Sequence, residues 1–417
     1  MPNLSTSPIR DDPAFGALAL LVLVAIAVGI LQGYAELGRR TITRHGMEDF
    51  GLFHASARQF LEGGTLYGPL RRPGLTRLSD ARNLNPPHAT LLFVPFAVLS
   101  PGLALQAWIL LNLLALCDVV RVLMRELRLP LMSLRTAMAA VFLLAWAPTA
   151  ALVITGQLAL VVAWPLTRAW RAARHGKWNR AGIWLGGAAA LKIFLLVFVP
   201  YLALRGRWPA LRRAIQQLAA CVVFGALVCG PSAYVEWAAQ FNDVTWYGHY
   251  MNASVWGLLA RVLHGFAGYA PLLPAARLGM ILGWLSAATI LCLTWRRAAT
   301  VREENVDASF TLLTAAALLA SPLGWVYYFW LPIAPAAATI AAAARSWSWA
   351  HRVAAGALAL GMLWHGSATV WFQPSGLATL TVGSPYLWSL FGVWLWLLIG
   401  NHPSLPSGAR VSGIASS

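Results

Sequence analysis

The stretch of sequence that decides the fold is AFGALALLVLVAIAVGILQGYA, residues 14–35. It is apolar throughout except for Gln32, and it supplies the ~20 residues that a membrane-spanning helix needs. The run is too long for a signal peptide, and no small-residue cleavage site follows it before Glu36. We therefore expect a first membrane helix here, with residues 1–13 as a short cytoplasmic tail.

The composition extends this expectation to the whole chain. Only 11% of the 417 residues are charged, whereas soluble proteins carry about a quarter. The chain is therefore a polytopic membrane protein. Further apolar runs lie at residues 87–99, 102–120, 136–154, 158–170, 181–204, 214–230, 277–295, 310–319, 326–344, 353–370 and 387–400. Together they predict a single all-α membrane domain over residues 1–417, with about 11–13 membrane segments.

The positive charge orients these segments. The net charge is +17, and most arginines fall in short clusters between apolar runs, at residues 121–135, 168–180, 205–213, 296–302 and 345–352. Such clusters mark the cytoplasmic side of a membrane protein, so the charge does not indicate nucleic-acid binding. The polar segments 36–86, 231–276 and 373–386 are left for the far side, although the parity of the spans stays open. Arginines are also frequent in 36–86, which an anionic ligand would explain.

A second decisive stretch follows the first span: EDFGLFHASARQFLEGGTLY, residues 48–67. Phe50, Phe53, Ala57 and Leu61 recur at helical spacing, which predicts an amphipathic helix. We expect this helix to lie along the membrane surface with its apolar side down. The glycines at 63 and 64 end it.

Two interpretations are open for Asp49 at the start of this helix. Aspartate is favoured at helix N-caps, but no capping box supports a cap, because the residue three positions on is Leu52. The alternative is a chemical role, with Glu48 beside it as a second acid. Capping and chemistry are compatible, and the residue types alone favour the cap.

Lys192 is the cation in the most apolar context of the chain, AGIWLGGAAALKIFLLVFVP. An ionisable residue within the membrane is expensive and marks a functional site by default. The competing interpretation is that the side chain extends to the interface. We favour a functional site.

Several blocks, taken in order, carry a family resemblance: residues 49–67, 85–96 (NPPHATLLFVPF), 155–157 (TGQ), 181–192 (AGIWLGGAAALK), 252–261 (NASVWGLLAR) and 321–325 (SPLGW). Their order resembles glycosyltransferase family 87, integral-membrane enzymes of the GT-C fold that use polyprenyl-phosphate sugars. The blocks span most of the chain. One departure is that members often carry His-His where this chain has Tyr327 and Tyr328, which puts a histidine role there in doubt.

The resemblance implies roles for several residues. Asp49 would be the catalytic base, with Glu48 as fallback, and Lys192 would contact the donor phosphate. The further candidates for substrate binding are His88, Gln157, Asn252, Arg261, Tyr327 and Tyr328. Five of these six have a competing structural interpretation: a structural hydrogen bond for His88, a turn for Gln157, an N-cap for Asn252 and an interfacial aromatic belt for the two tyrosines.

The implied activity is inverting transfer of a hexose, with mannose foremost, from a polyprenyl-phosphate donor to a lipid or glycan acceptor. The site would face the extracytoplasmic side of a bacterial-type cell membrane. No nucleotide-binding motif and no DxD triplet occurs in the sequence, so we expect neither a nucleotide nor a metal cofactor. Two other hypotheses stay open: a lipid or glycan transporter or flippase, and a non-catalytic protein of envelope assembly.

Overall fold

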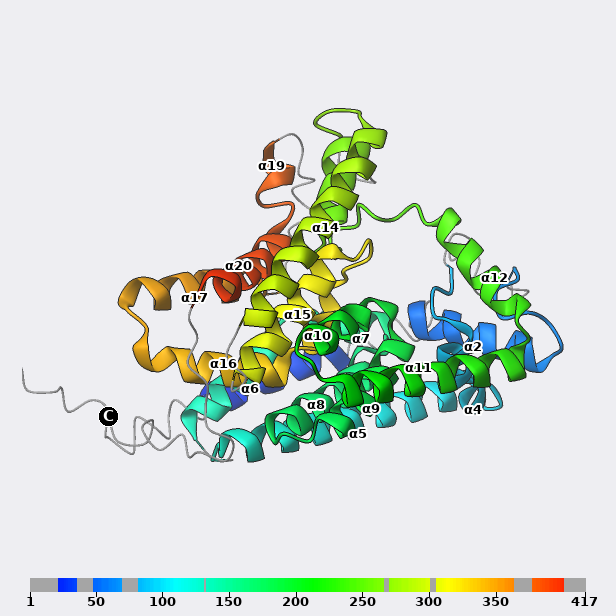
Figure 1. The fold of residues 1–417 in the computed structure, drawn as a ribbon, viewed down its shortest axis with the longest axis horizontal. Helices are drawn as coiled ribbons and strands as arrows, with labels where there is room; N and C mark the ends of the chain where they lie inside the picture. Colours follow the sequence, from blue (N-terminus) through cyan, green and yellow to red (C-terminus); the bar gives the residue numbers. More distant parts are fainter. Residues whose placement is uncertain are drawn as a thin grey trace, which may run out of the picture.

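The computed structural model describes residues 22–35, 48–69, 82–130, 133–265, 270–300, 305–363 and 377–400. Figure 1 shows an all-helical chain. Within these ranges β-structure is limited to two isolated bridges, which join Trp146 to Leu363 and Asn252 to Trp325. The predicted all-α class is confirmed.

Three of the described helices are long and apolar enough to cross a membrane: α5 (Pro101–Leu127), α11 (Trp208–Cys229) and α14 (Ala276–Thr300). Large apolar side chains are exposed on all three, such as Leu114, Leu227 and Trp284. An aqueous surface would not carry so many, so these faces suit lipid. The polytopic membrane class is thereby confirmed, while the number of segments stays a prediction.

Shorter helices fill the space between them. They are Val22–Ala35, α2 (Glu48–Leu61), α3 (Pro87–Thr90), α4 (Val94–Ala97), α6 (Leu134–Ala145), α7 (Ala147–Thr155), α8 (Ala159–Arg174), α9 (Trp178–Leu191), α10 (Phe198–Leu204), α12 (Ser232–Gln240), α13 (Val255–Leu259), α15 (Val306–Ala320), α16 (Ile333–Ala343), α17 (Trp349–Gly361), α19 (Leu377–Leu380) and α20 (Pro385–Ile399). Two 3-10 turns matter for the site: η4 (Ile193–Val197) and η7 (Val326–Trp330).

Helix α15 forms the centre of the core. Its residues are buried from Val306 to Leu319, and it packs against α14, α16 and α20. The hydroxyls of Thr311 and Thr314 donate to carbonyls one turn earlier in the same helix, each at 2.8 Å. These two hydroxyls are thus satisfied within the helix, as an apolar environment requires.

Helices α9 and α11 pack very closely. A Cβ atom added at Gly182 or Gly186 would lie 2.1 or 2.3 Å from the carbonyl oxygen of Ala210 or Ala214. Glycines four residues apart permit such an approach between membrane helices. Helix α9 ends where Lys192 adopts an extended backbone, so this packing positions the lysine.

The helix predicted from residues 48–67 exists as α2, but its apolar face contacts protein where we expected lipid. Phe50, Phe53 and Ala57 are buried. The ring of Phe53 lies 4.9 Å from that of Phe93, and the ring of Phe50 lies 5.8 Å from that of Trp108. Aromatic side chains of the 87–97 segment and α5 supply the apolar surface, which the periodicity of α2 alone could not identify.

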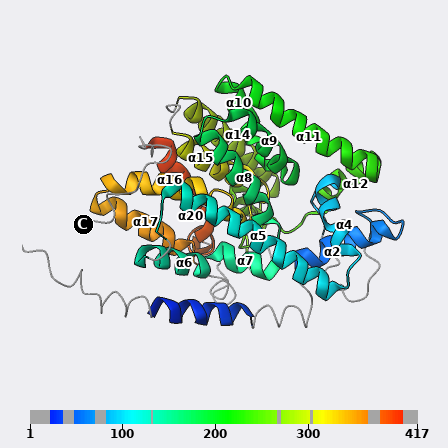
Figure 2. The ribbon, with the colours of Figure 1, turned by 90° about the horizontal axis from the view of Figure 1, so that it is seen from below.

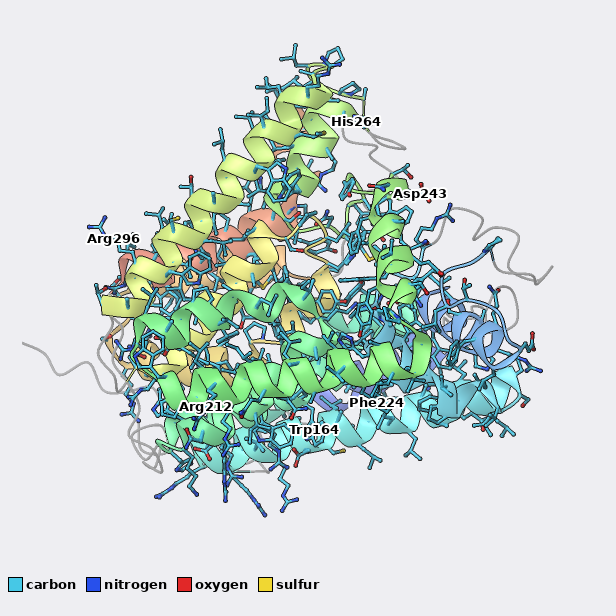
Figure 3. The ribbon with its side chains drawn as sticks, turned by 45° about the vertical axis from the view of Figure 1, so that its right-hand side comes forward. Trp164, Arg212, Phe224, Asp243, His264 and Arg296 are labelled. Carbon is cyan, nitrogen blue, oxygen red and sulfur yellow. The ribbon has the colours of Figure 1, made fainter. Side chains whose placement is uncertain are left out.

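The outer elements fall on different sides of the molecule. Figure 2 shows helix Val22–Ala35 at the edge opposite α11, and the Tyr34 hydroxyl donates to the carbonyl oxygen of Leu144 in α6. Figure 3 shows Arg212 and Arg296 at one end of the molecule, and Asp243 and His264 at the other. The two predicted far-side segments meet, because Arg82 forms an ion pair with Asp243 at 3.3 Å.

Candidate functional site

A cavity of about 980 Å³ opens where α7 and α9 end and α2 begins. It brings together five of the residues predicted for the site from distant parts of the sequence: Asp49, Gln157, Lys192, Tyr327 and Tyr328. The side chain of Glu48, the fallback base, lies outside what the structure describes.

The Asp49 carboxylate is held by an amide. The Nε2 atom of Gln157 donates to Asp49 Oδ2 at 2.7 Å. Gln157 reaches it because Gly156 adopts a left-handed backbone with φ 67° and ends α7. The indole of Trp108 donates to the Gly156 carbonyl at 2.8 Å. Gln157 therefore follows the turn at Gly156 and also lines the cavity, so a structural position at a turn is compatible with a place in the site.

Lys192 is held by a neutral acceptor. Its Nζ donates to Asn85 Oδ1 at 2.7 Å and lies 5.4 Å from the centre of the Tyr328 ring. The charge of Asp49 also acts on the ammonium group. The arrangement combines a hydrogen bond, a cation–π contact and a nearby opposite charge.

Tyr327 and Tyr328 line the cavity from η7. Both are buried, their rings pack edge to face at 4.7 Å, and both interact with the charge of Asp49. Because they are enclosed by protein, an interfacial belt does not describe them. A buried phenol is a hydrogen-bond donor or acceptor without a charge.

His88 lies outside the cavity lining. Its Nδ1 is 2.9 Å from the hydroxyl of Tyr234, and its Nε2 is 2.8 Å from the carbonyl oxygen of Ala190. The structure does not bring His88 into the cavity, so its predicted contact with substrate stays a prediction. The histidine instead ties the start of α3 to α12 and to the last turn of α9, and that turn leads into Lys192.

Asn252 and Arg261 are also absent from the lining, and both are fully buried directly behind it. Asn252 Nδ2 donates to the carbonyls of Tyr247 and Pro322, each at 2.9 Å. Arg261 donates to the His249 carbonyl at 3.0 Å and to Ser384 Oγ at 2.9 Å. The structure does not bring either side chain into the cavity, and their predicted contact with substrate stays a prediction. The expected N-cap at Asn252 is made by Ser254, whose hydroxyl accepts from Gly257 N.

The cavity includes residues to which the sequence analysis assigned no role. Asn85 is the acceptor for Lys192, and its place in the NPPH block was a usable signal. His249 lines the wall together with Trp325. The Nδ1 atom of His249 accepts from Met251 N at 3.2 Å, which leaves the proton on Nε2. Burial, reinforced by the charge of Arg261, lowers the pKa of His249 to about 4, so the imidazole is neutral at physiological pH.

Most of the remaining lining is apolar, although Arg82, Thr155 and Ser321 also contribute polar groups. Ile193, Leu196 and Pro200 contribute from the segment that follows Lys192, and Trp284, Leu291 and Trp295 contribute from α14. Trp284 is itself 65% exposed on the outer face of α14. The same cavity thus combines the polar groups with an apolar surface that a long apolar chain could contact.

The described residues contain no cluster of three or more histidines, cysteines, aspartates or glutamates that could hold a metal ion. Chemically, the site offers a carboxylate that can accept a proton and an ammonium group that can stabilise an anion, both within one enclosed space. Transfer reactions with an anionic leaving group require this pair of functions.

Comparison with known proteins is consistent with this chemistry. The family model of glycosyltransferase family 87 matches residues 83–322, more than half of the chain. A curated relative from Mycolicibacterium smegmatis is 26% identical over 276 residues, which cover 63% of this chain and 64% of the relative. That relative is a polyprenol-phosphate-mannose-dependent alpha-(1-2)-phosphatidylinositol pentamannoside mannosyltransferase. The match spans less than two thirds of its length, and no solved structure matches the chain.

Proposed function

The chain belongs to glycosyltransferase family 87, and on this premise we propose that it transfers a hexose, with mannose foremost, from a polyprenyl-phosphate donor to a lipid or glycan acceptor. The observation that carries the proposal is the shared cavity of Asp49, held by Gln157, and Lys192, held by Asn85. The donor named for the mycobacterial relative supports the lipid-phosphate class.

The proposed reaction is a single displacement. Asp49 accepts the proton of the acceptor hydroxyl while that oxygen attacks the anomeric carbon of the donor sugar. The bond between the anomeric carbon and the phosphate oxygen breaks, and the polyprenyl phosphate leaves as an anion beside Lys192. Attack from the face opposite the leaving group inverts the anomeric configuration. In this scheme one group accepts the proton and another stabilises the leaving anion, and the cavity contains both, Asp49 and Lys192.

The apolar half of the cavity suits the donor tail. It begins directly after Lys192, at Ile193, and continues to Trp295 on α14. A polyprenyl chain placed there would keep its phosphate near the ammonium group and bury apolar surface at about 25 cal/mol per Å².

The charge distribution supports an extracytoplasmic site. Helix α8 begins just after Gln157 and ends at Arg174, and α9 begins at Trp178 and ends at Leu191, beside Lys192. The cavity and the arginine clusters therefore lie at opposite ends of the same helices. Arginine-rich loops are retained in the cytoplasm, so we propose that the cavity faces the other side of the cell membrane.

The test is Asp49→Asn, assayed in membranes with labelled polyprenyl-phosphate mannose and extracted acceptor lipids. We expect transfer to fall at least ~100-fold, the scale of a lost general base, with unchanged expression and thermal stability. The matched control is Glu62→Gln, which alters an exposed acid just beyond the other end of α2 and should leave transfer unchanged. Full transfer by Asp49→Asn would refute the assigned base.

A further inference from the structure

We propose that four cavity-lining aromatic residues, Trp246, Tyr247, His249 and Trp325, form a carbohydrate subsite that binds the sugar ring of the acceptor. We call this set the aromatic wall. The acceptor role rests on the proposed function, whereas binding of a sugar ring at the wall does not depend on turnover. Three features of the structure carry the inference.

The first feature is the fixed backbone of the loop that carries most of the wall. Asn252 spans it with its whole amide: Nδ2 donates to Tyr247 O and Pro322 O, and Oδ1 accepts from Ser254 N and Gly324 N. Arg261 adds hydrogen bonds to the carbonyls of His249 and Asn252. Two fully buried polar side chains thus hold the loop, which keeps its aromatic groups pre-organised and lowers the entropy cost of binding.

The second feature is a continuous series of ring contacts from the wall to the reacting groups. The His249 and Trp325 rings meet edge to face at 5.7 Å, and the Trp325 and Tyr327 rings stack at 6.1 Å. Tyr327 contacts Tyr328 at 4.7 Å, and the Tyr328 ring lies 5.4 Å from Lys192 Nζ. The wall therefore adjoins, through Tyr327 and Tyr328, the part of the cavity where Lys192 is proposed to hold the donor phosphate.

The third feature is the chemistry of these side chains. Aromatic groups with one polar atom offer a flat apolar face together with a hydrogen-bond donor, and a sugar ring presents the complementary apolar C–H face and hydroxyl edge. The imidazole of His249 is neutral, with its proton on Nε2, so it offers a donor without a charge. Four aromatic groups that include a neutral imidazole suit a neutral carbohydrate better than a second phosphate.

The experiment measures equilibrium binding of octyl α-mannoside and octyl β-glucoside to the full chain in nanodiscs. Saturation-transfer NMR detects the sugar ring protons, and an octyl tetraethylene glycol ether controls for the alkyl chain. We expect saturable binding of at least one glycoside, weakened at least tenfold by Trp325→Leu and by less than threefold by Trp325→Phe, which keeps an aromatic face. Trp349→Leu, at a tryptophan 79% exposed, should bind as the wild type does.

Trp246→Leu is the second variant, and it decides the outcome if Trp325→Leu does not fold. Loss of binding in either variant supports the subsite. The subsite is overturned if both variants bind the glycosides as tightly as the wild type does, or if the wild type binds neither glycoside. Asp49→Asn separates the two proposals, because it should keep glycoside binding while transfer is lost. If the wild type transfers no sugar but binding still depends on Trp325, the subsite stands and the proposed function fails.

Discussion

Lys192 can sit within an apolar stretch because its acceptor is itself fixed. Asn85 is 1% exposed. Its backbone N and its side-chain Nδ2 both donate to Asn83 Oδ1, at 3.1 and 3.2 Å, and its carbonyl accepts from Tyr67 at 2.7 Å. A buried charge is tolerated only when polar groups compensate for lost hydration. Asn85 is therefore a positioning residue, which fixes the ammonium group and does not itself meet the reacting atoms.

Replacing Asn85 by alanine should loosen this cation. A hydrogen bond to a charged group contributes about 1.5–3 kcal/mol, so we expect KM for the polyprenyl-phosphate donor to rise roughly tenfold or more. KM for the acceptor should stay within twofold of wild type, which a general loss of folding would not produce. Asn242→Ala, at an exposed asparagine of the far-side segment, is the control and should change neither constant. An equal rise in both KM values for Asn85→Ala would contradict the positioning role.

His249 makes stability depend on pH in a defined direction. Its pKa is lowered from 6.5 to about 4 by burial, so below pH 6.5 the unfolded chain binds a proton that the folded chain does not. The free energy of unfolding should then fall as the pH drops from 6.5 to 4, by ~1.4 kcal/mol per pH unit and about 3 kcal/mol in total. This contribution is constant above pH 7.

The measurement is the thermal unfolding midpoint in detergent at pH 4.5, 5.5 and 7.5. His249→Asn keeps an acceptor for Met251 N and should flatten the acid side of the profile. His264→Asn, at an exposed histidine, should retain the wild-type slope. Identical slopes for wild type and His249→Asn would show that the buried imidazole is not the group responsible.

At the scale of elements, the glycines of α9 decide how closely two membrane helices approach. Gly186 faces the backbone of α11, whereas a Cβ at its neighbour Gly187 would meet nothing within 4 Å. A change from glycine to alanine alters the helix propensity equally at the two positions, because both lie in the same helix. The two positions therefore differ only in packing.

Gly186→Ala should force α9 away from α11, because a clash with a backbone carbonyl cannot be relieved by a rotamer change. Overpacking of this kind costs about 1–3 kcal/mol. Gly187→Ala should be neutral or slightly stabilising. Thermal unfolding in detergent compares the two, and donor KM should rise only for Gly186→Ala, because α9 ends at Lys192. Equal stability of the two variants would argue against the close packing.

The elements also show how far the sequence could be interpreted. Helix α2 followed from periodicity, the role proposed for its acid followed from the family resemblance, and the lysine followed from its apolar context. Asn252 and Arg261 were assigned to substrate, because a polar residue that lines a cavity and one that holds a loop look alike in a single sequence. Their hydrogen bonds to carbonyls of distant segments depend on tertiary structure. The contact of the apolar face of α2 with protein, where we expected lipid, likewise depends on tertiary structure.

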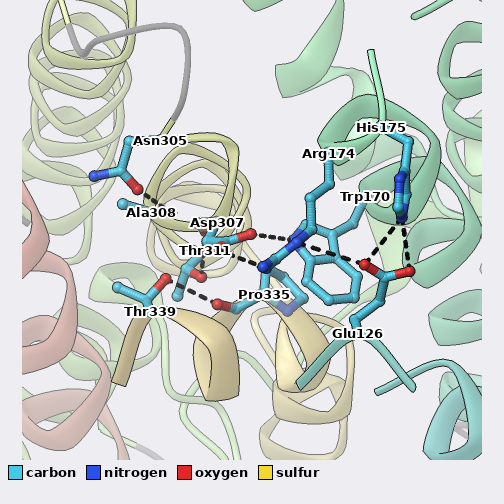
Figure 4. Close-up of polar contacts among 10 residues, drawn as sticks. All are labelled: Glu126, Trp170, Arg174, His175, Asn305, Asp307, Ala308, Thr311, Pro335 and Thr339. Atoms are coloured by element: carbon cyan, nitrogen blue, oxygen red, sulfur yellow. Dashed lines mark hydrogen bonds and ion pairs between the residues drawn. The ribbon is translucent and has the colours of Figure 1, made fainter. Parts of the chain in front are cut away.

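At the scale of the whole molecule, a buried ionic network lies at the arginine-rich ends of the helices (Figure 4). Arg174 Nη1 donates to Asp307 Oδ2 at 2.8 Å, and its Nε lies 3.5 Å from Glu126 Oε2. Trp170 and His175 add hydrogen bonds to the same carboxylates. The network joins α5, α8 and α15, the helices around the core. The arginine clusters predicted orientation, but which arginines pair inside the protein depends on helix packing.

Arg174→Met tests whether this network holds the helices independently of the cavity. Arg174 and both its carboxylate partners are 4–5% exposed, and removal of one member of a buried pair costs about 3–5 kcal/mol, because the remaining charge is left uncompensated. Arg168→Met is the matched control on the same helix. Its pair with Asp118 is 30% and 19% exposed, so a loss of about 1 kcal/mol or less is expected. Thermal unfolding should separate the two variants, while donor KM at a permissive temperature should match wild type in both. A raised donor KM in Arg174→Met would show instead that the two ends of the helices are coupled.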